Sequence, residues 1–323
     1  MSMTITARNV NHALAQAIWH FRTAGVKADS RNGPVVRLPG VVITEYTKPC
    51  ERLCLLPERD ANHVFHLVES LWMFAGMDDV SPLLPFNSKY AQYAEEDWRQ
   101  HGAYGYRWRK HFGNEQIMQV MDELKHNPYS RRVVLTMWDP QVDLGADVAD
   151  VPCNTHAYFD VVDGHVNMTV CNRSNDVIWG AYGANAVHFS MLLELVASGA
   201  GLEVGVYRQV SNNFHIYTEM GQGRALMENP QFEVYDPYTA ETPLYVPKLL
   251  LAGETAWDFM QDCRRLFGLL PGSPTNNFMR TVAEPLMTAY LMRKAGEEYG
   301  HYLDIVPECD WKFAFTKWTE RRA

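Results

Sequence analysis

The chain has 323 residues, of which 47% are hydrophobic and 21% are charged, and its formal net charge at pH 7 is −9. This length can bury a substantial core in one large domain or two, and the acidic balance argues against a nucleic-acid or anionic-membrane surface. With no run of eighteen apolar residues and no signal-peptide core in MSMTITARNVNHALAQ, the sequence predicts a cytoplasmic protein.

The first clear helical pattern runs from Ala61 to Ala75, and residues 114–126 predict a second amphipathic helix. Residues 133–138 (VVLTMW) then indicate a short buried strand. Two further strands, 156–162 and 165–172, flank Asp163-Gly164, a pair that is typical of a hairpin turn.

Helical spacing returns from Ala186 to Ser198, and residues 203–217 indicate a strand followed by a turn. Proline-bearing loops follow beyond about residue 230, and then a long amphipathic stretch at 281–300. This mixed order predicts an α+β fold, with a central sheet of mainly neighbouring strands in one domain. The domain is expected to span 1–323.

The six cysteines are scattered through the chain, which is not typical of a disulfide framework; they stand at positions 50, 54, 153, 171, 263 and 309. Cys50 and Cys54 lie close together, but no second Cys or His pair with metal-ligand spacing accompanies them. No metal site is therefore predicted.

Cys153 stands 21 residues after the Arg131-Arg132 pair and 20 before Arg173. A lone cysteine is most often a small buried hydrophobe, but cationic neighbours lower a thiol pKa and favour a nucleophile. A Cys-His hydrolase using His156 stays open, although the odd spacing along a strand would turn His156 away.

Two other features suit a nucleophile that acts on a phosphorylated substrate. Arg131, Arg132 and Arg173, with the hydroxyl of Ser174, can hold a dianionic phosphate, because each guanidinium donates paired hydrogen bonds. Glu69 interrupts an apolar helix face, so it lies either on the polar edge of that helix or buried and available for proton transfer.

Several dispersed motifs between Asp29 and Tyr217 resemble the thymidylate synthase superfamily, which includes the pyrimidine nucleotide hydroxymethylases; in order they are DSRNG, VESLW, GAYGYRWR, SRRVVL, PCN, NRSNDVIWG and NNFHIY. The resemblance implies a mixed sheet with surrounding helices and a homodimer formed through the sheet face. It also implies 5,10-methylenetetrahydrofolate as co-substrate, without a metal.

The resemblance assigns roles to individual residues. Cys153 would add to C6 of a pyrimidine, while Glu69 moves protons through ordered water and Tyr104 assists removal of the C5 proton. The 5′-phosphate would be held by Arg31, Arg173 and Ser174, with Arg131 and Arg132 donated across the dimer. The sugar and base would meet His215, Tyr217, Asn172 and Asn185, and the folate would meet Asp176, Trp72 and Tyr90.

The chain also departs from the family pattern. Asn154 replaces the usual His after the nucleophile, Asn172 replaces a Gln, and Tyr90 and Tyr93 stand where tryptophans usually wall the folate-side cavity. The segment from about residue 255 is divergent, and ECDWKFAFTKWTERRA lacks the short apolar tail that closes over folate. Because a wetter cavity favours attack by water over hydride transfer, these departures favour hydroxymethylation over methylation.

The base is less clear from the sequence. Family members that read uracil use an asparagine amide, and the cytosine-specific ones use an aspartate. The segment WGAYGANAVHF offers Asn185 with one inserted residue and Ala184 without it. Neither is a carboxylate, so dUMP is favoured slightly over dCMP. A thymidylate synthase and a catalytically silent nucleotide-binding homologue remain as alternatives.

Overall fold

A mixed six-stranded sheet forms the centre of the computed structural model, which describes residues 2–219, 221–229, 234 and 236–322. Its strands lie in the order β1 (Met3–Ala7), β4 (Val42–Tyr46), β9 (Glu203–Ser211), β7 (His165–Asn172), β6 (Asn154–Val162) and β5 (Val134–Thr136). The pairs β1–β4 and β7–β9 are parallel, and the other neighbours are antiparallel.

A smaller four-stranded sheet lies beside it, in the order β2 (Val26–Ser30), β3 (Gly33–Arg37), β10 (Phe214–Tyr217) and β8 (Asn175–Asp176). Two chain segments pass from the large sheet directly into the small one: β7 leads to β8 and β9 leads to β10. Backbone hydrogen bonds hold these crossings together, from Asn212 N–H to Asn172 O (2.9 Å) and from Asn175 N–H to Asn213 O (2.8 Å). The junction between the sheets is therefore a fixed point of the fold.

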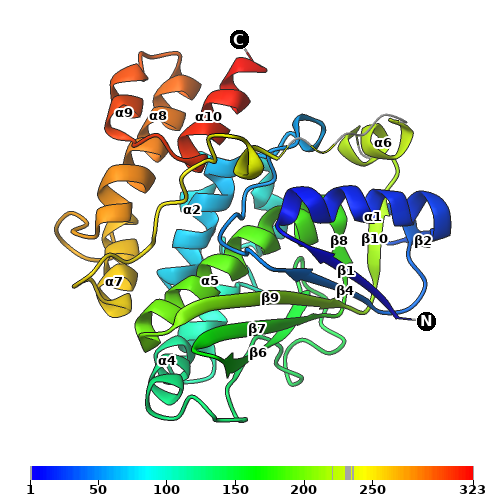
Figure 1. Cartoon of the computed structure of the whole chain (residues 1–323), viewed down its shortest axis with the longest axis horizontal. Coiled ribbons are helices and arrows are strands. Elements are labelled where there is room, and N and C mark those ends of the chain that lie inside the picture. Colours follow the sequence, from blue (N-terminus) through cyan, green and yellow to red (C-terminus); the bar gives the residue numbers. More distant parts are fainter. Residues whose placement is uncertain (1, 220, 230–233, 235, 323) are drawn as a thin grey trace.

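One buried helix packs on a face of the large sheet, and a second buried helix packs on the first (Figure 1). In α2 (His63–Phe74) all twelve residues are buried, and α5 (Asn185–Ala200) is almost as enclosed. A helix that is apolar on all sides belongs in a core, which explains why these two lie at the centre of the molecule. The helix α1 (Val10–Ala24) packs on β1 and β4, and Asn9 caps its first turn.

The remaining helices surround this centre: α3 (Tyr104–Tyr106), α4 (Gln116–His126), α6 (Gly221–Glu228), α7 (Ala256–Leu266), α8 (Glu284–Ala295), α9 (Gly300–Ile305) and α10 (Asp310–Glu320). In Figure 1, α8, α9 and α10 gather at the end of the molecule remote from β6. The last helix packs on α2, and beyond it Arg322 pairs with Asp60.

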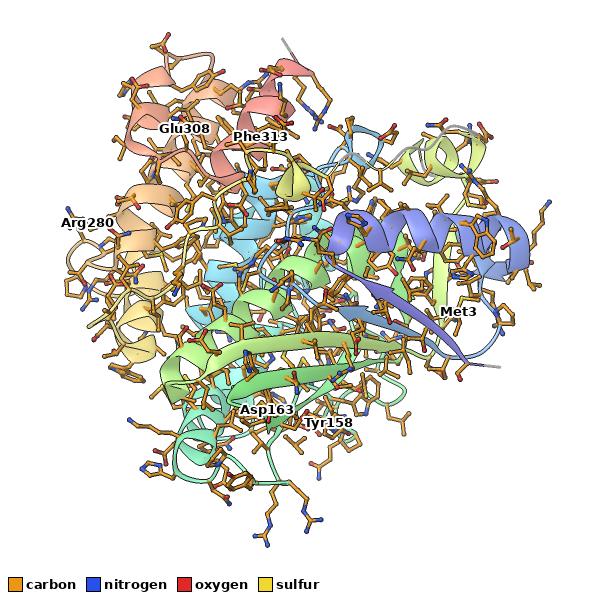
Figure 2. All side chains as sticks on the ribbon, viewed as in Figure 1. Met3, Tyr158, Asp163, Arg280, Glu308 and Phe313 are labelled. Carbon is orange, nitrogen blue, oxygen red and sulfur yellow. The ribbon has the colours of Figure 1, made fainter. Side chains whose placement is uncertain are left out.

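The other face of the large sheet carries a row of side chains that lie beside one another in register. Val134 is paired with Tyr158, Tyr158 with Thr169, and Thr169 with Arg208. Val134 and Tyr158 are 43% and 44% exposed, which is high for large hydrophobic residues on a sheet. Tyr158 and the nearby hairpin residue Asp163 lie far from Glu308 and Phe313 of the C-terminal region (Figure 2).

Most of the predicted elements are confirmed, including both predicted central helices and the hairpin of β6 and β7. Asp163 and Gly164 have φ values of 49° and 77°, as a tight two-residue turn requires. The predicted strand 133–138 is shorter, at Val134–Thr136, and the long stretch at 281–300 ends as a helix at Gly296 (φ 76°).

The expectation of mainly neighbouring strands is wrong for half of the sheet. Only β5, β6 and β7 are adjacent in both sequence and space, because β4 enters between β1 and β9. These N-terminal strands come from residues 3–46, for which the sequence patterns predicted no elements. Among the helices of the described residues, none is long and apolar enough to cross a membrane.

Candidate active site

Cys153 lies just before β6, at the junction of the two sheets. Its carbonyl accepts a hydrogen bond from Arg173 N–H (2.9 Å), which ties it to the crossing from β7 to β8. Pro152 precedes it and fixes the local backbone, as a proline does. The thiol is half-buried, which fits a group presented to a cavity rather than one packed in the core.

Tyr104 supports this segment from behind. Its hydroxyl oxygen accepts hydrogen bonds from the backbone N–H groups of Cys153 and Asn154, both at 3.1 Å. The tyrosine is brought close by Gly105, where a Cβ would lie 2.0 Å from the carbonyl oxygen of Met73 in α2. Because the oxygen only accepts in these bonds, the hydroxyl hydrogen of Tyr104 is left for another partner.

Opposing charges act on the Cys153 thiol. Burial raises its pKa, Arg173 and Arg31 lower it, and Asp150 and Asp176 raise it again. The net pKa is above that of a free thiol, so the thiol is mainly protonated at neutral pH when no ligand is bound. Arg173 thus acts on Cys153 as expected from the sequence, whereas Arg31 takes the place of the expected Arg131 and Arg132 among the charges that act most on it. The two arginines do not ionise the thiol by themselves.

A chain of buried amides lies beside the cysteine. Asn154 Nδ2 donates to Asn185 Oδ1 (3.1 Å), and Asn185 Nδ2 donates to Asn175 Oδ1 (3.1 Å). Asn175 in turn donates to Gln209 (2.9 Å) and Ser211 (3.0 Å) on β9. The structure therefore brings Asn185 next to the residue that follows the nucleophile.

Glu69 is buried in α2, so the second of its two predicted environments is the one observed. The hydroxyl of Tyr90 is 2.7 Å from Glu69 Oε1, and His188 Nε2 of α5 is 3.1 Å from Glu69 Oε2. Tyr90 thus contacts a candidate catalytic carboxylate. Trp72 packs in the core with 1% exposure, and its indole N–H donates to Asp79 O (2.7 Å), which leaves no surface for a cofactor.

The predicted phosphate ligands fall into two groups. Arg173 is exposed, and its guanidinium donates to the carbonyls of Pro152 and Val151 (both 2.8 Å), while Arg31 lies in the exposed turn between β2 and β3. Ser174 follows Arg173 and is half-buried. Arg131 and Arg132 are exposed before β5, and their side chains have no hydrogen-bond partner among the described residues.

The small sheet supplies the remaining predicted residues. His215 of β10 stands in register with Asp176 of β8, and its ring meets that of Tyr217 edge-on with centroids 5.2 Å apart. Asp176 Oδ2 accepts the N–H of Trp179 (2.6 Å), but its buried Oδ1 has no partner within the described residues, and neither has Asn172 Oδ1. A buried acceptor without a donor is rare in a native protein and marks a place for a ligand.

Sequence reasoning did not single out Arg59, Asp150, Gln100 or His188. Arg59 is buried close over Gly183, where a Cβ would lie 2.7 Å from its Nη2, and Asp176 acts on its charge. Of these four, Asp150 is the one that the sequence could have indicated as a site residue, since it is a carboxylate three positions before Cys153. The others come from separate loops and helices, and only the tertiary structure brings them together.

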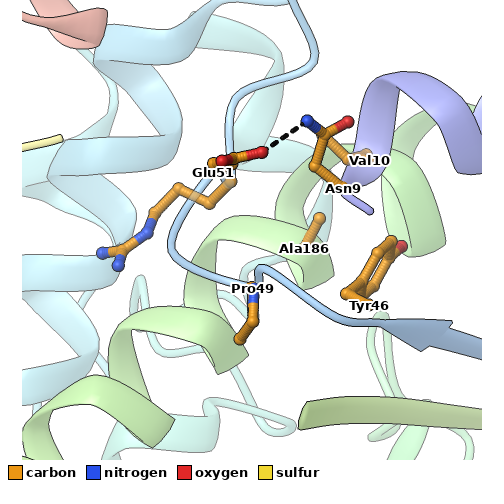
Figure 3. Close-up of a pocket in the computed structure, with 7 residues that line it drawn as sticks. Asn9, Val10, Tyr46, Pro49, Glu51 and Ala186 are labelled. Carbon is orange, nitrogen blue, oxygen red and sulfur yellow. Dashed lines mark hydrogen bonds between the residues drawn. The ribbon is translucent and has the colours of Figure 1, made fainter. Parts of the chain in front are cut away.

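The alternative sites receive less support. His156 stacks on Tyr158 (6.1 Å between centroids), and the charges that act most on Cys153 do not include it. A bulge between Asn154 and His156 does, however, remove the simple alternation on which its predicted direction depended. Figure 3 shows a hollow bordered by Asn9, Tyr46, Pro49 and Ala186, and Cys153 is not among the residues that line it. Asn9 there donates a hydrogen bond to Glu51 (2.8 Å). No group of residues in the described part of the chain has the composition of a metal site.

Comparison with known proteins places this geometry in a family. The thymidylate synthase family model matches residues 15–262. The chain is 43% identical to the deoxyuridylate hydroxymethyltransferase of Pseudomonas phage M6, over 98% of this chain and 94% of that protein. It is 34% identical to the protein of the same name from Bacillus phage SP01, over 55% of this chain and 49% of that protein. It is also 38% identical to the thymidylate synthase of Oenococcus oeni, over 32% of this chain and 31% of that protein. The chain belongs to the thymidylate synthase family.

Proposed function

We propose that this protein transfers a one-carbon unit from 5,10-methylenetetrahydrofolate to C5 of deoxyuridine 5′-monophosphate, and that water completes the reaction to give a hydroxymethyl group. The observation that carries this proposal is the nearly full-length similarity to a deoxyuridylate hydroxymethyltransferase. The hydroxymethyltransferases that it resembles are phage proteins, which supports the cytoplasm of a host cell as the place of reaction.

In this proposal the Cys153 sulfur adds to C6 of the uracil ring and makes C5 nucleophilic. Tyr104 assists removal of the C5 proton, because its oxygen is held by two backbone N–H groups that stabilise negative charge as it develops. Glu69 moves protons on the other side of the ring, where the Tyr90 hydroxyl hydrogen-bonds the carboxylate and His188 Nε2 lies 3.1 Å from it. The bonds from Tyr104 to the cysteine segment and from Tyr90 to Glu69 support these roles.

The base would be read by Asn185. An amide both donates and accepts, so it can match the O4 acceptor and the N3–H donor of uracil at once. No carboxylate stands in the Asn154–Asn185–Asn175 chain, which disfavours the amino group of cytosine. His215 and Tyr217 would hold the sugar hydroxyl, and Asn172, with an unpartnered Oδ1, would face the nucleotide.

The phosphate would be bound by Arg31, Arg173 and Ser174 of one subunit and by Arg131 and Arg132 of a second copy. Two bonds to the carbonyls of Val151 and Pro152 orient the Arg173 guanidinium and leave further N–H groups for an anion. The exposed row of Val134, Tyr158 and Thr169 on the open sheet face is the surface that we assign to the dimer contact. Arg131 and Arg132 lie directly before that face.

The residues around Asp176 fit a folate. Its unpartnered Oδ1 is an acceptor for a ring N–H, and the indole of Trp179, 44% exposed, offers an aromatic surface close by. When bound, methylenetetrahydrofolate supplies the carbon that becomes the new substituent. Asp176 would orient it, and Tyr93 would border its reactive end, whereas Tyr90 is engaged with Glu69 and Trp72 is enclosed in the core.

One assay tests this function against its alternatives. The protein is incubated with methylenetetrahydrofolate and either dUMP or dCMP, and the nucleotide product is weighed by mass spectrometry. We expect dUMP to gain CH2O and the folate to leave as tetrahydrofolate. A gain of CH2 with formation of dihydrofolate would identify a thymidylate synthase instead, and an unchanged nucleotide that still binds would identify a silent homologue.

A further inference from the structure

Asp150 is a carboxylate three residues before Cys153 whose charge acts on that thiol, and the reaction described above does not use it. It is half-buried, and its Oδ2 accepts a hydrogen bond from Gln100 Nε2 (2.7 Å). Gly102 leaves room for it, because a Cβ at that position would lie 2.5 Å from the same oxygen. Burial raises the pKa of Asp150, although the bond from Gln100 and the charge of Arg173 act in the opposite direction.

The negative charge of Asp150 acts on the titratable groups around the nucleophile. Its charge contributes to the raised pKa values of Cys153, Tyr93 and Tyr104. The pKa of Tyr93 is raised to about 12, first by burial and then by the charges of Asp150 and Glu69. The Tyr93 hydroxyl has no hydrogen-bond partner within the described residues. Asp150 and the Tyr93 hydroxyl therefore both keep hydrogen-bonding capacity that a water molecule can use.

A hydrogen-bonded chain joins Asp150 to Glu69. Gln100 Oε1 lies 2.9 Å from the hydroxyl of Tyr90, and that hydroxyl lies 2.7 Å from Glu69 Oε1. The one hydrogen of Tyr90 cannot be given to both acceptors. Either Glu69 is protonated and donates to Tyr90, or the Gln100 amide is turned, so that Nε2 donates to Tyr90 and Oε1 accepts from a protonated Asp150. Both arrangements satisfy the chain with one proton shared by the two carboxyl groups.

We propose that Asp150 is the general base for the water that completes the reaction, and that Tyr90 and Gln100 connect it to Glu69 as a shared-proton relay. This inference rests on the hydroxymethyl transfer proposed above. It assigns a residue to the step that separates a hydroxymethyl product from a methyl product.

The step balances without an oxidant or a reductant. The nucleotide attached to Cys153 carries an exocyclic methylene on C5 after the folate has left. The oxygen of water forms a bond to this methylene carbon, its proton passes to Asp150, and the electron pair of the C5=CH2 bond moves into the C5–C4 enolate. Re-forming the C5=C6 bond then expels Cys153 as a thiolate. Asp150 returns its proton to the relay or to solvent.

Asp150→Asn keeps the size and the contact with Gln100 but removes the base. We measure two rates in single turnovers, with the protein in excess over dUMP labelled with tritium at C5: release of tritium, which reports loss of the C5 proton, and formation of hydroxymethyl nucleotide, which reports the water step. The two rates should be equal in the unmodified protein. In the variant we expect hydroxymethyl formation to fall about a hundredfold while tritium release stays within about threefold, a loss typical of removing a general base.

A thiol supplies the second readout. A small thiol such as 2-mercaptoethanol ionises without help, so it should trap the methylene as a thioether equally well in the variant and in the unmodified protein. Gln100→Leu, which leaves Asp150 but breaks the relay, should shift the two rates in the same direction by a smaller factor. Glu95→Gln is the matched control, because among the described residues the Glu95 carboxylate accepts only the N–H of Ala149, the neighbour of Asp150 (2.9 Å), and it should leave both rates equal.

Asp150 is not the base if hydroxymethyl formation in Asp150→Asn stays within about threefold of the unmodified protein. The inference is equally overturned if tritium release falls together with product, or if the thiol captures nothing, since either result places the defect before the water step. If the unmodified protein makes a methyl product, the proposed function itself fails, and that outcome is seen before any variant is tested.

Discussion

Two regions of this protein bury carboxyl groups, but they differ in how fully their oxygens are used. At the start of α10, Asp310 is completely buried and accepts from the Tyr238 hydroxyl (2.9 Å) and the Trp311 N–H (2.9 Å). Beside it, Glu194 pairs with Arg52 and accepts the Leu249 N–H (2.9 Å). Each oxygen of these two carboxyl groups has a donor, as in a structure that needs no further component.

The candidate site around Cys153 contrasts with this. Asp176 and Asn172 each bury an oxygen that lacks a partner in the described chain, and the hydroxyl of Tyr93 is also free there. Burial raises the carboxyl pKa in both regions, at Asp310 as at Asp150 and Asp176. A raised pKa therefore does not distinguish the two, whereas buried acceptor oxygens without a donor do, since they occur at Asp176 and Asn172 and not at Asp310 or Glu194.

Replacing the nucleophile is the strongest way to test which region is functional. Cys153→Ala should lower product formation at least a thousandfold, because no other group can form the bond to C6. Release of tritium from C5 of dUMP should disappear with it, while nucleotide binding measured by calorimetry should stay within about threefold. Persistent tritium release would show that the adduct forms on another residue.

The part of the fold that sequence patterns predicted is the part with regular periodicity. The helix containing Glu69 and the hairpin of β6 and β7 follow from apolar spacing and from Asp163-Gly164, which are local signals. The N-terminal strands carried no such signal, and β4 reaches its place between β1 and β9 only through tertiary pairing.

The site follows the same division. Cys153, Tyr104, Asn154 and Asn185 lie together as predicted, because the motifs that carry them flank the junction of the two sheets. Gln100 and His188 stayed unrecognised, since a polar residue in a loop or helix has no meaning until its partner is known. Arg131 and Arg132 remain a prediction, because a single chain cannot show what a second copy contributes.

A change at Asn185 probes the amide chain with a smaller effect. In the unmodified protein, Asn185 Nδ2 donates to Asn175 Oδ1. Asn185→Asp replaces this donor by an acceptor, which would lie against Asn175 Oδ1 and against O4 of uracil. We expect the kcat/KM for dUMP to fall about a hundredfold, and the ratio of dCMP to dUMP turnover to rise, because cytosine carries a donor at C4. Measuring both nucleotides with the same preparation controls for loss of folded protein. An unchanged ratio would exclude Asn185 from base recognition.

A change at Asp310 should leave turnover unaltered and act on stability alone. The folded protein holds the Asp310 proton up to a pKa of about 7, whereas the ordinary value is 3.8; burial is the main cause and the charge of Glu194 adds to it, while Tyr238 and Arg52 act in the opposite direction. Between these values the folded state binds more protons than the unfolded state, so this group lowers stability as pH rises from about 4 to 7.

Asp310→Asn removes the titration while keeping a group that can bond to Tyr238 and Trp311. Relative to the unmodified protein, the variant should therefore gain unfolding free energy between pH 4.5 and pH 8, by on the order of a few kcal/mol, as measured by urea denaturation. Asp304→Asn, at an exposed carboxylate of α9, is the matched control and should show no pH-dependent difference. Parallel curves for Asp310→Asn and the unmodified protein would mean that Asp310 is ionised throughout. The Asp310 region would then be an ion cluster, and its contrast with the Cys153 site would rest on charge rather than on the partners of its carboxyl oxygens.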